Sequence, residues 1–287
     1  MNHPAPPWTP CLPPAPRSIQ KGVPLKHVLG DQAVEYLGRN VQSVYTAFDV
    51  KGFRAMALNG LEPLGILDRG HHVAQALWQH LPQRFSSATQ VLLQSLTPPV
   101  DSTSELGLAV FFYLPHVSFV AQYGLDPAHN GGDDPFEAAM QAQYELTQRF
   151  SAEFSIRRFL IEQPERTLAC LQKWTTDPSP HVRRLCSEGT RPRLPWAMRL
   201  PAFIKDPNPL MPLLEALKDD PDLYVRRSVA NHLGDIAKDH PEWVYAVCER
   251  WLHNASSERK WLIRHALRHP AKKGDETALS LRNRSKS

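Results

Sequence analysis

Apolar residues in the first half of the chain recur at the spacing of an amphipathic helix. They are three to five residues apart in segments that run over 28–48, 53–67, 72–81 and 88–96. This interval places apolar side chains on one face of an α-helix, where they can face a common core. No alternation of apolar and polar residues long enough for a β-strand occurs along the 287 residues. The pattern therefore predicts an all-α fold.

The longest stretch without a charged residue, 107–125, approaches the length of a membrane span. It carries Pro115, His116, Ser118 and Gln122 near its middle, and polar side chains are costly in the hydrocarbon layer. We therefore expect a buried helix at this position, and no membrane partner.

The second half contains an internal repeat. The string DPSPHVRRL at 177–185 recurs as DPDLYVRRS at 220–228, an offset of 43 residues, and a weaker copy, IRHA, follows at 263–266. Offsets near 40 residues are typical of HEAT-like helix pairs, which stack into a solenoid. In such a pair we expect the Asp to cap the second helix and the Pro to occupy its first turn. The sequence thus predicts a HEAT-like helical-repeat superhelix, an α-solenoid.

Stacked repeats place equivalent residues in a row. In this chain the row would contain Arg183, Arg184, Arg226, Arg227 and Arg264. A guanidinium group binds phosphate through two parallel donors, so such a row suits the backbone of duplex DNA. Arginine at this position can also pair with an Asp of the neighbouring repeat and serve stability alone. Periodicity leaves both roles open.

A segment that a solenoid does not need, 187–196, follows the first repeat helix. It inserts Gly189, two prolines, two arginines and Trp196. Rigid loops on a scaffold are where binding and catalytic residues concentrate. Near it, Asn231 and Asp235 are four residues apart and share one helix face. We therefore expect the functional site around this loop.

Charge is distributed unevenly along the chain. The formal net charge is +4, but residues 1–150 hold 9 basic and 12 acidic side chains, whereas residues 151–287 hold 24 and 17. An anionic partner would therefore bind the second half. The four cysteines form no CxxC pair, so we expect neither disulfides nor a zinc site, and the cytoplasm is the expected compartment. No metal or cofactor is expected.

The first sixteen residues contain seven prolines. This density removes backbone hydrogen-bond donors and favours an extended, polyproline-like chain. We expect residues 1–22 to form a disordered tail, residues 23–281 to form a single HEAT-like domain, and residues 282–287 to form a basic C-terminal tail.

Three strings in the second half resemble one protein family. They are FSAEFSIRRFL at 150–160, HVRRLCSEGTRPRLPWAMRL at 181–200 and YVRRSVANHLGDIAKDHP at 224–241. They look like the AlkC branch of the AlkC/AlkD alkylpurine DNA glycosylases, whose fold is a HEAT-like superhelix, and the likeness extends over about 23–281. The family's usual EFAIRPFL reads EFSIRRFL here, and HLNDIAKDHP reads HLGDIAKDHP. The immunoglobulin-like C-terminal domain of some members is expected to be absent, which affects DNA contacts more than chemistry.

The resemblance implies hydrolysis of the N-glycosidic bond of a cationic base, such as 3-methyladenine, with 3-methylcytosine and 1-methyladenine as alternatives. A cationic base is already an activated leaving group, so the enzyme must stabilise oxocarbenium character on the sugar and orient a water. Glu153 and Asp235 are the candidate carboxylates, and Trp196 would attract the cationic base. Without a lysine nucleophile, strand cleavage is not expected. Alternatively, the two acids pair with Arg157 and Arg191 for stability, and Trp196 is a buried plug.

We therefore predict a monomeric DNA glycosylase of base excision repair that acts on alkylated duplex DNA in the bacterial nucleoid. Besides Glu153, Asp235 and Trp196, which should converge on one cleft, we expect DNA contacts from Arg157, Arg183, Arg184, Glu188, Arg191, Arg193, Arg226, Arg227, Asn231, Lys238 and Arg264. The alternative is a non-catalytic HEAT scaffold that binds DNA or protein, in which the three candidates would be scattered. The resemblance also suggests that the lesion is not deeply flipped into a pocket.

Overall fold

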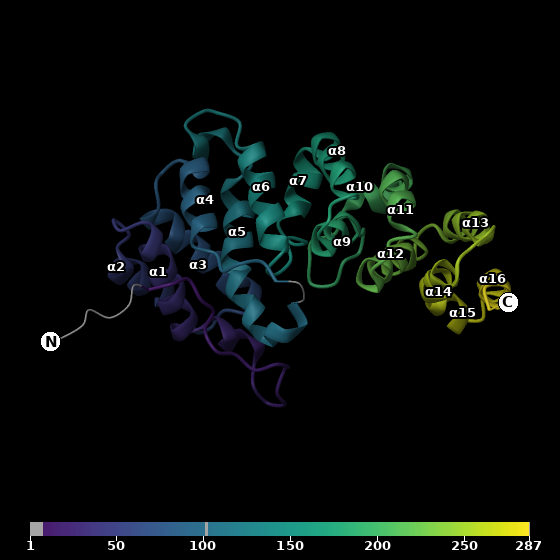
Figure 1. Ribbon diagram of the computed structural model, residues 1–287, viewed down its shortest axis with the longest axis horizontal. Helices are drawn as coiled ribbons and strands as arrows, with labels where there is room; N and C mark the ends of the chain where they lie inside the picture. The colour runs from purple at the N-terminus through teal and green to yellow at the C-terminus, as the bar shows by residue number, and fades with distance from the viewer. Residues whose placement is uncertain (1–7, 101–102, 287) are drawn as a thin grey trace. The chain divides into compact units, whose positions relative to one another are not determined.

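The computed structural model describes residues 8–100 and 103–286. Within these ranges the chain is helical and forms no strand, which confirms the all-α prediction. The chain groups into two compact units, residues 1–155 (unit 1) and residues 156–287 (unit 2). Figure 1 shows the helices of both units along the chain.

Unit 1 builds its core from paired amphipathic helices. The helix α3 packs against α2 and α5, and α6 packs against α4 and α5. Phe53, Leu77, Phe85 and Phe119 are fully buried between them. The elements of this unit are η1 (Leu25–Leu29), α1 (Asp31–Val44), α2 (Val50–Leu58), α3 (Ile66–His80), α4 (Phe85–Gln94), η2 (Thr103–Tyr113), α5 (Leu114–Tyr123), η3 (Pro127–Asn130) and α6 (Phe136–Thr147), where η denotes a 3-10 helix.

The long uncharged stretch forms η2 and α5. The segment Leu106–Tyr123 is long and apolar enough to cross a membrane by length and composition, and 61% of it is buried inside the protein. All residues from 114 to 121 are buried. Gly70 on α3 permits this packing, because a Cβ there would lie only 2.7 Å from Cγ of Leu114. The structure thus shows the buried helix that the sequence predicts.

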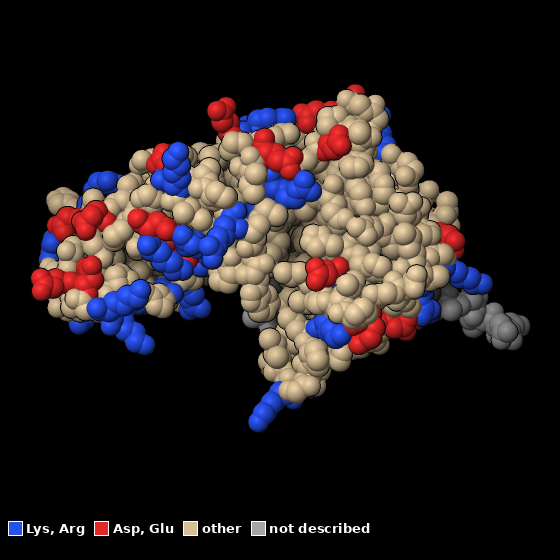
Figure 2. Space-filling view, turned by 180° about the vertical axis from the view of Figure 1, so that it is seen from behind, with Lys and Arg blue, Asp and Glu red and all other residues tan. Residues whose placement is uncertain are grey.

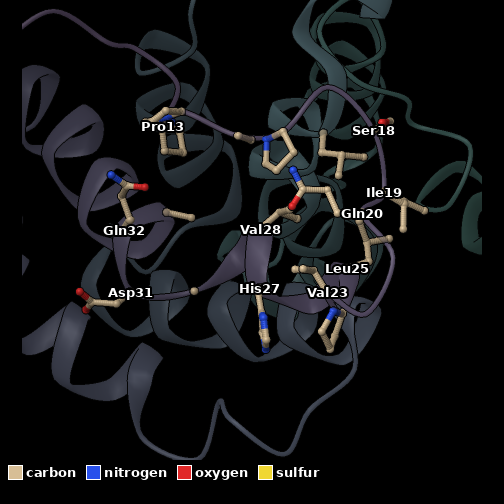
Figure 3. A pocket seen from close by; sticks show the side chains of 17 residues that line it. Pro13, Ser18, Ile19, Gln20, Val23, Leu25, His27, Val28, Asp31 and Gln32 are labelled. Carbon is tan, nitrogen blue, oxygen red and sulfur yellow. The ribbon is translucent and has the colours of Figure 1, made fainter.

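The described part of the proline-rich segment packs against the helices of its own unit. The indole N–H of Trp8 donates to Oδ1 of Asn40 at 2.9 Å, and the Asn40 amide donates to the carbonyl of Cys11 at 2.9 Å. Residues 13–16 and 18–20 line a cavity of about 180 Å³ beside η1 and the start of α1, as Figure 3 shows. The extent of the disordered tail expected over 1–22 stays a prediction, and residues 1–7 lie outside the described residues.

Unit 2 consists of stacked helix pairs. The pairs are α8/α9, α11/α12 and α13/α14, and α12 packs between α9 and α14, as expected for HEAT-like repeats. Residues 282–284, expected in a C-terminal tail, belong to the last helix. The elements of this unit are α7 (Ile156–Glu162), α8 (Pro164–Trp174), α9 (Pro180–Glu188), α10 (Pro201–Lys205), η4 (Asn208–Leu210), α11 (Met211–Leu217), α12 (Leu223–Ile236), α13 (Pro241–Leu252), α14 (Ser257–Ala266), α15 (Arg268–Lys272) and α16 (Glu276–Arg284).

The two strong copies of the repeat form the same turn before α9 and α12. Oδ1 of Asp177 accepts the N–H of Ser179 at 2.8 Å, and Oδ1 of Asp220 accepts the N–H of Asp222 at 2.9 Å. Ser179 and Asp222 are the N-cap residues of the two helices. The Asp of each repeat copy therefore shapes an Asx turn two residues before the N-cap instead of capping the helix itself.

The first arginine of each pair braces the same turn. Nη1 of Arg183 donates to the carbonyls of residues 177 and 178 at 2.9 and 3.0 Å, and Nη1 of Arg226 donates to those of residues 220 and 221 at 2.6 and 2.7 Å. Nε of Arg183 also pairs with Oδ2 of Asp220 in the next repeat at 2.6 Å. This is the inter-repeat ion pair that the sequence left open as an alternative to phosphate binding.

The weaker third copy does not share this register. Val182 and Val225 are the third residues of α9 and α12, whereas Ile263 is the seventh residue of α14. Arg264 donates to the carbonyl of Ser285 and not to a turn at the start of its own helix. The predicted alignment of this copy is therefore wrong at the helix start, because a four-residue string in which only the arginine is identical does not define where a helix begins.

Candidate functional site

The loop that joins α9 to α10, residues 189–200, presents Trp196 to solvent. The side chain of Trp196 is 64% exposed, and its backbone is left-handed, with a φ of 66°. This conformation is rare for a bulky residue, costs energy, and is found at functional sites more often than elsewhere. The alternative of a buried plug is therefore wrong. Trp196 is available to a ligand.

A fully buried arginine on α7 holds this loop in place. Arg157 donates through Nε to the carbonyl of Met198 at 2.5 Å and through Nη1 to the carbonyls of Gly189 and Arg191 at 3.0 and 2.8 Å. These acceptors lie on both sides of Trp196 in the sequence. Because Arg157 has 0% exposure, its guanidinium acts on the loop backbone and offers no surface to a phosphate. We assign it as a positioning residue in place of the predicted DNA contact.

Arg191 joins two buried carboxylates in the same region. Its Nε lies 2.8 Å from Oδ2 of Asp235 near the end of α12, and its Nη1 lies 2.7 Å from Oε1 of Glu188 at the end of α9. The exposures of Asp235 and Glu188 are 3% and 6%. Oδ1 of Asp235 accepts from Nζ of the more exposed Lys238 at 2.8 Å. Asp235 thus forms the ion pair with Arg191 that the sequence analysis gave as the structural alternative. Its catalytic role stays a prediction.

Hydrogen bonds and charges keep Glu188 ionised. Burial alone would raise the pKa of this carboxyl, but the positive charges of Arg184 and Arg191 outweigh burial and lower it. The hydroxyl of Ser228 on α12 donates to its Oε2 at 2.6 Å. Nothing in the sequence pointed to Ser228, since it is 40 residues away in the chain and in the next repeat.

His232 lies in the interior beside this cluster. It is fully buried, and its Nδ1 is 3.5 Å from the hydroxyl of Ser187. Burial and then the positive charges of Arg191 and Arg157 lower its pKa to about 3. The imidazole is therefore neutral at physiological pH, and it adds no positive charge to the site.

The remaining predicted arginines of this region have diverse surroundings. The guanidinium of Arg184 stacks over the ring of Tyr224 at 4.9 Å. Arg193 forms a two-pronged pair with Asp239, with both contacts at 2.7 Å. Arg227 is exposed on α12, as a direct phosphate contact requires. Their contacts with DNA stay predictions.

Asn231 is oriented by two residues that sequence reasoning missed. Its Oδ1 accepts from Nε2 of His265 at 3.2 Å and from Nη2 of Arg268 at 2.9 Å. Burial, followed by the charge of Arg268, lowers the pKa of His265 to about 4, so the neutral ring donates through Nε2. His265 lies on α14 and Arg268 begins α15, next to the string IRHA whose alignment was out of register.

Glu153 belongs to the segment that closes unit 1. Its Oε2 accepts from the hydroxyl of Ser151 at 2.7 Å, and Oγ of Ser151 accepts the Glu153 N–H at 3.3 Å. This arrangement fixes the carboxylate locally. Its role beside Asp235 stays a prediction.

Basic side chains are abundant on unit 2. On the face in Figure 2, the part at the left of the view carries most of the Lys and Arg, interspersed with Asp and Glu. Across residues 8–100 and 103–286, no group of three or more His, Cys, Asp or Glu side chains could hold a metal ion.

Comparison with known proteins identifies the class. Residues 149–269 match the family described as DNA alkylation repair enzyme. An uncharacterized protein of Bacillus subtilis (strain 168), YhaZ, is 36% identical over 258 residues, which cover 90% of this chain and 67% of that protein. The structure of Pseudomonas fluorescens alkylpurine DNA glycosylase AlkC, bound to DNA containing an abasic site analog, is 39% identical with a TM-score of 0.79, covering 90% of this chain and 67% of that chain.

The HEAT-like helix pairs and these matches define a helical-repeat protein of DNA alkylation repair. Within that class, the chain belongs to the AlkC-type family of DNA alkylation repair glycosylases. The family resemblance drawn from the three sequence strings is thereby confirmed.

Proposed function

We propose that this protein is a monofunctional DNA glycosylase that hydrolyses the N-glycosidic bond of cationic N3-methylated bases in duplex DNA. One structural observation carries the proposal. The loop that projects Trp196 into solvent also supplies Arg191, which holds the buried Asp235 carboxylate at 2.8 Å. The exposed indole on this loop and the buried carboxylate on α12 are thus linked through Arg191.

The chemistry of a cationic lesion fits such a site. Departure of a methylated, positively charged base leaves oxocarbenium character on the deoxyribose, which a carboxylate can stabilise while it orients the attacking water. The indole face of Trp196 attracts a cation with about 0.5 to 2 kcal/mol. Since the base leaves as a neutral molecule, the reaction needs no proton donor. No lysine nucleophile takes part, so the strand stays intact.

Asp235 is the candidate catalytic carboxylate in unit 2, and Glu153 is the candidate in unit 1. Arg191 and Lys238 both donate to Asp235, so its free lone pairs are few until a ligand draws Lys238 away. The same paired acid would be purely structural in a scaffold that binds DNA without catalysis. Activity measurements decide between the two functions.

The test is release of bases from duplex DNA treated with a methylating agent, followed by chromatography of the products. We expect 3-methyladenine to be released, with 3-methylcytosine and 1-methyladenine compared on defined oligonucleotides. A uracil-containing duplex serves as the neutral control, because a neutral leaving group needs a proton donor. Duplex binding without base release would favour the scaffold, and efficient uracil excision would contradict the mechanism.

A further inference from the structure

The side-chain amide of Asn231 on α12 is fixed by residues outside its own helix. Its Oδ1 accepts from Nη2 of Arg268 at 2.9 Å and from Nε2 of His265 at 3.2 Å. A guanidinium group donates hydrogen bonds and accepts none, so the amide atom that faces Arg268 is the oxygen. The amide nitrogen is therefore turned away from both partners, and the amide cannot flip without losing these two bonds.

The two residues that hold the amide are themselves held in place. The ring of His265 stacks on that of Trp261, with the ring centroids 5.0 Å apart and the planes at 17°. Nη1 of Arg268 donates to the carbonyl of His265 at 2.6 Å. Side chains whose rotamers are locked in this way fix the direction of a neighbouring group before a ligand arrives. Asn231 thus presents an amide whose orientation is set in advance.

Nδ2 of Asn231 is a hydrogen-bond donor with no protein acceptor. Across residues 8–100 and 103–286, the side chain of Asn231 forms only the two bonds to its oxygen. The residue is half-buried, and Nδ2 is not among its buried atoms. The nitrogen is therefore accessible to a ligand, while the oxygen is fully used by the protein.

Asn231 lies on the side of α12 that carries the candidate carboxylate. Arg227 and Asp235 are four residues before and after it, so the three side chains are neighbours along the helix. Arg268 belongs to the same region. Burial and then the charge of Arg191 lower the pKa of Arg268, whereas the charge of Asp235 raises it. Four residues of α-helix span about 6 Å, so Nδ2 and the carboxylate can reach groups of one nucleotide.

The surroundings of this amide are basic. After burial, the charges that lower the pKa of His265 come from Arg268, Arg227 and His269. Arg227 is exposed. Asp235, the acid of this helix, already forms two ion pairs. A DNA phosphate is the anionic acceptor that such surroundings favour, and asparagine side chains are among its common donors.

We infer that Nδ2 of Asn231 donates to a phosphate oxygen of the strand that carries the lesion, beside the sugar that Asp235 would stabilise. Arg268 and His265 then act as positioning residues that aim the amide. The inference rests on the proposed function, because it takes duplex DNA with a lesion as the ligand. A neutral donor fixed in advance adds direction to binding without adding charge. The arginines thus supply attraction, and the amide sets the register of the strand.

The variant Asn231→Asp separates the two sides of the amide. A carboxylate at this position still accepts from Arg268 and His265, so the melting temperature should stay at or above that of the wild type. The donor is lost and a negative charge faces the phosphate. Affinity for a duplex with an abasic-site analog, measured by fluorescence anisotropy, should therefore fall by more than about tenfold.

The matched control is Asn283→Asp. Asn283 is exposed on α16, and its Oδ1 accepts from Nζ of Lys286 at 3.1 Å. The control thus adds the same charge to the same unit, again at an asparagine that accepts from a cation. It should change DNA affinity by about twofold at most, because it acts only through screened repulsion.

A single uncharged methylphosphonate, placed in turn at each phosphate around the lesion, locates the contact. At one position it should restore most of the affinity that Asn231→Asp loses, because the repulsion is removed there. The affinity of Asn283→Asp relative to the wild type should be the same at every position. Wild-type affinity of Asn231→Asp, or a loss that no position restores, would overturn the inference.

A second pair of variants tests the positioning role of His265. Asn231→Leu removes the donor without adding charge, so affinity should fall roughly tenfold at an unchanged slope of log affinity against log salt. His265→Phe keeps an aromatic ring beside Trp261 but no longer holds the amide, so it should weaken binding several-fold. In the Asn231→Leu background it should have no further effect. Full additivity would show that His265 does not act through the amide.

Base release distinguishes failure of this inference from failure of the proposed function. If the wild type binds duplex DNA but releases no methylated base, the proposed function fails, and the methylphosphonate series still decides the amide contact. If the wild type releases methylated bases and no methylphosphonate restores binding by Asn231→Asp, the inference alone fails.

Discussion

Replacing Arg157 tests whether its buried guanidinium holds the loop that carries Trp196 in place. Its three hydrogen bonds to the carbonyls of residues 189, 191 and 198 are the main link between α7 and the Trp196 loop. Each hydrogen bond from a charged donor contributes about 1.5 to 3 kcal/mol, and desolvation of the guanidinium offsets part of the sum. We therefore expect Arg157→Met to lower the free energy of unfolding by about 3 to 5 kcal/mol. Such a loss is large against a typical total of about 5 to 15 kcal/mol.

The same variant should behave unlike one that removes a phosphate contact. Arg227 is exposed on α12, so Arg227→Ala should keep the melting temperature and reduce the slope of log affinity against log salt by about 0.9. Arg157→Met should weaken DNA binding with the slope unchanged, because the loop loses its shape while no phosphate contact is lost. If Arg157→Met folds poorly, the comparison can be made with Arg157→Lys. This variant keeps the positive charge and should lose less stability.

Urea unfolding and anisotropy titrations at several salt concentrations on the same preparations provide both measurements. The reasoning is refuted if Arg157→Met or Arg157→Lys retains wild-type stability and reduces the salt slope as much as Arg227→Ala does. That result would mean that the Arg157 guanidinium contacts a DNA phosphate, as predicted from the sequence.

Three further outcomes are expected. Asp235→Asn should reduce the single-turnover rate of excision roughly a hundredfold, with DNA affinity retained or slightly raised. A lower melting temperature at an unchanged rate would instead show that the ion pair of Asp235 with Arg191 is only structural. Trp196→Ala should slow excision roughly fivefold and leave thermal stability unchanged, since the indole is 64% exposed; a destabilised variant would mean that the loop packs on the ring. The folded-state pKa values of His116 and His232 are lowered to about 3 and that of His265 to about 4, so all three protonate more readily when unfolded. The free energy of unfolding should therefore be highest above about pH 6.5 and should fall towards pH 4, by up to about 1.4 kcal/mol per pH unit for each histidine. The melting temperature of His232→Phe, measured across this range, should depend less on pH than that of the wild type.

Local periodicity was sufficient to predict the helical fold, because the apolar interval and the repeated DP turn are properties of short segments. It could not predict the direction of a buried arginine. Arg183 and Arg226 occupy a repeating position that suits phosphate binding, yet the structure directs both into the carbonyls of their own turns. Only the three-dimensional turn, with its exposed backbone acceptors, shows that these guanidinium groups are already engaged.

The functional loop could be located from its composition but not described from it. Two prolines and a glycine after a repeat helix indicated an insertion, and the structure shows that Trp196 is exposed there. Trp196 has a left-handed backbone, and Arg157 holds the loop on both sides of it through the carbonyls of residues 189, 191 and 198, which are 32 to 41 residues from Arg157 in the chain. Contacts over that separation leave no periodic signal in the sequence.

The two neighbouring arginines of α12 have different tasks. In α12, Arg226 is committed to the carbonyls of residues 220 and 221, while Arg227 beside it is exposed. A substitution at the outer position can alter what this surface recognises and leave the turn intact. A substitution at the inner position first damages the repeat. Ligand preference can therefore drift during evolution through single codon changes, without a matching repair anywhere in the scaffold.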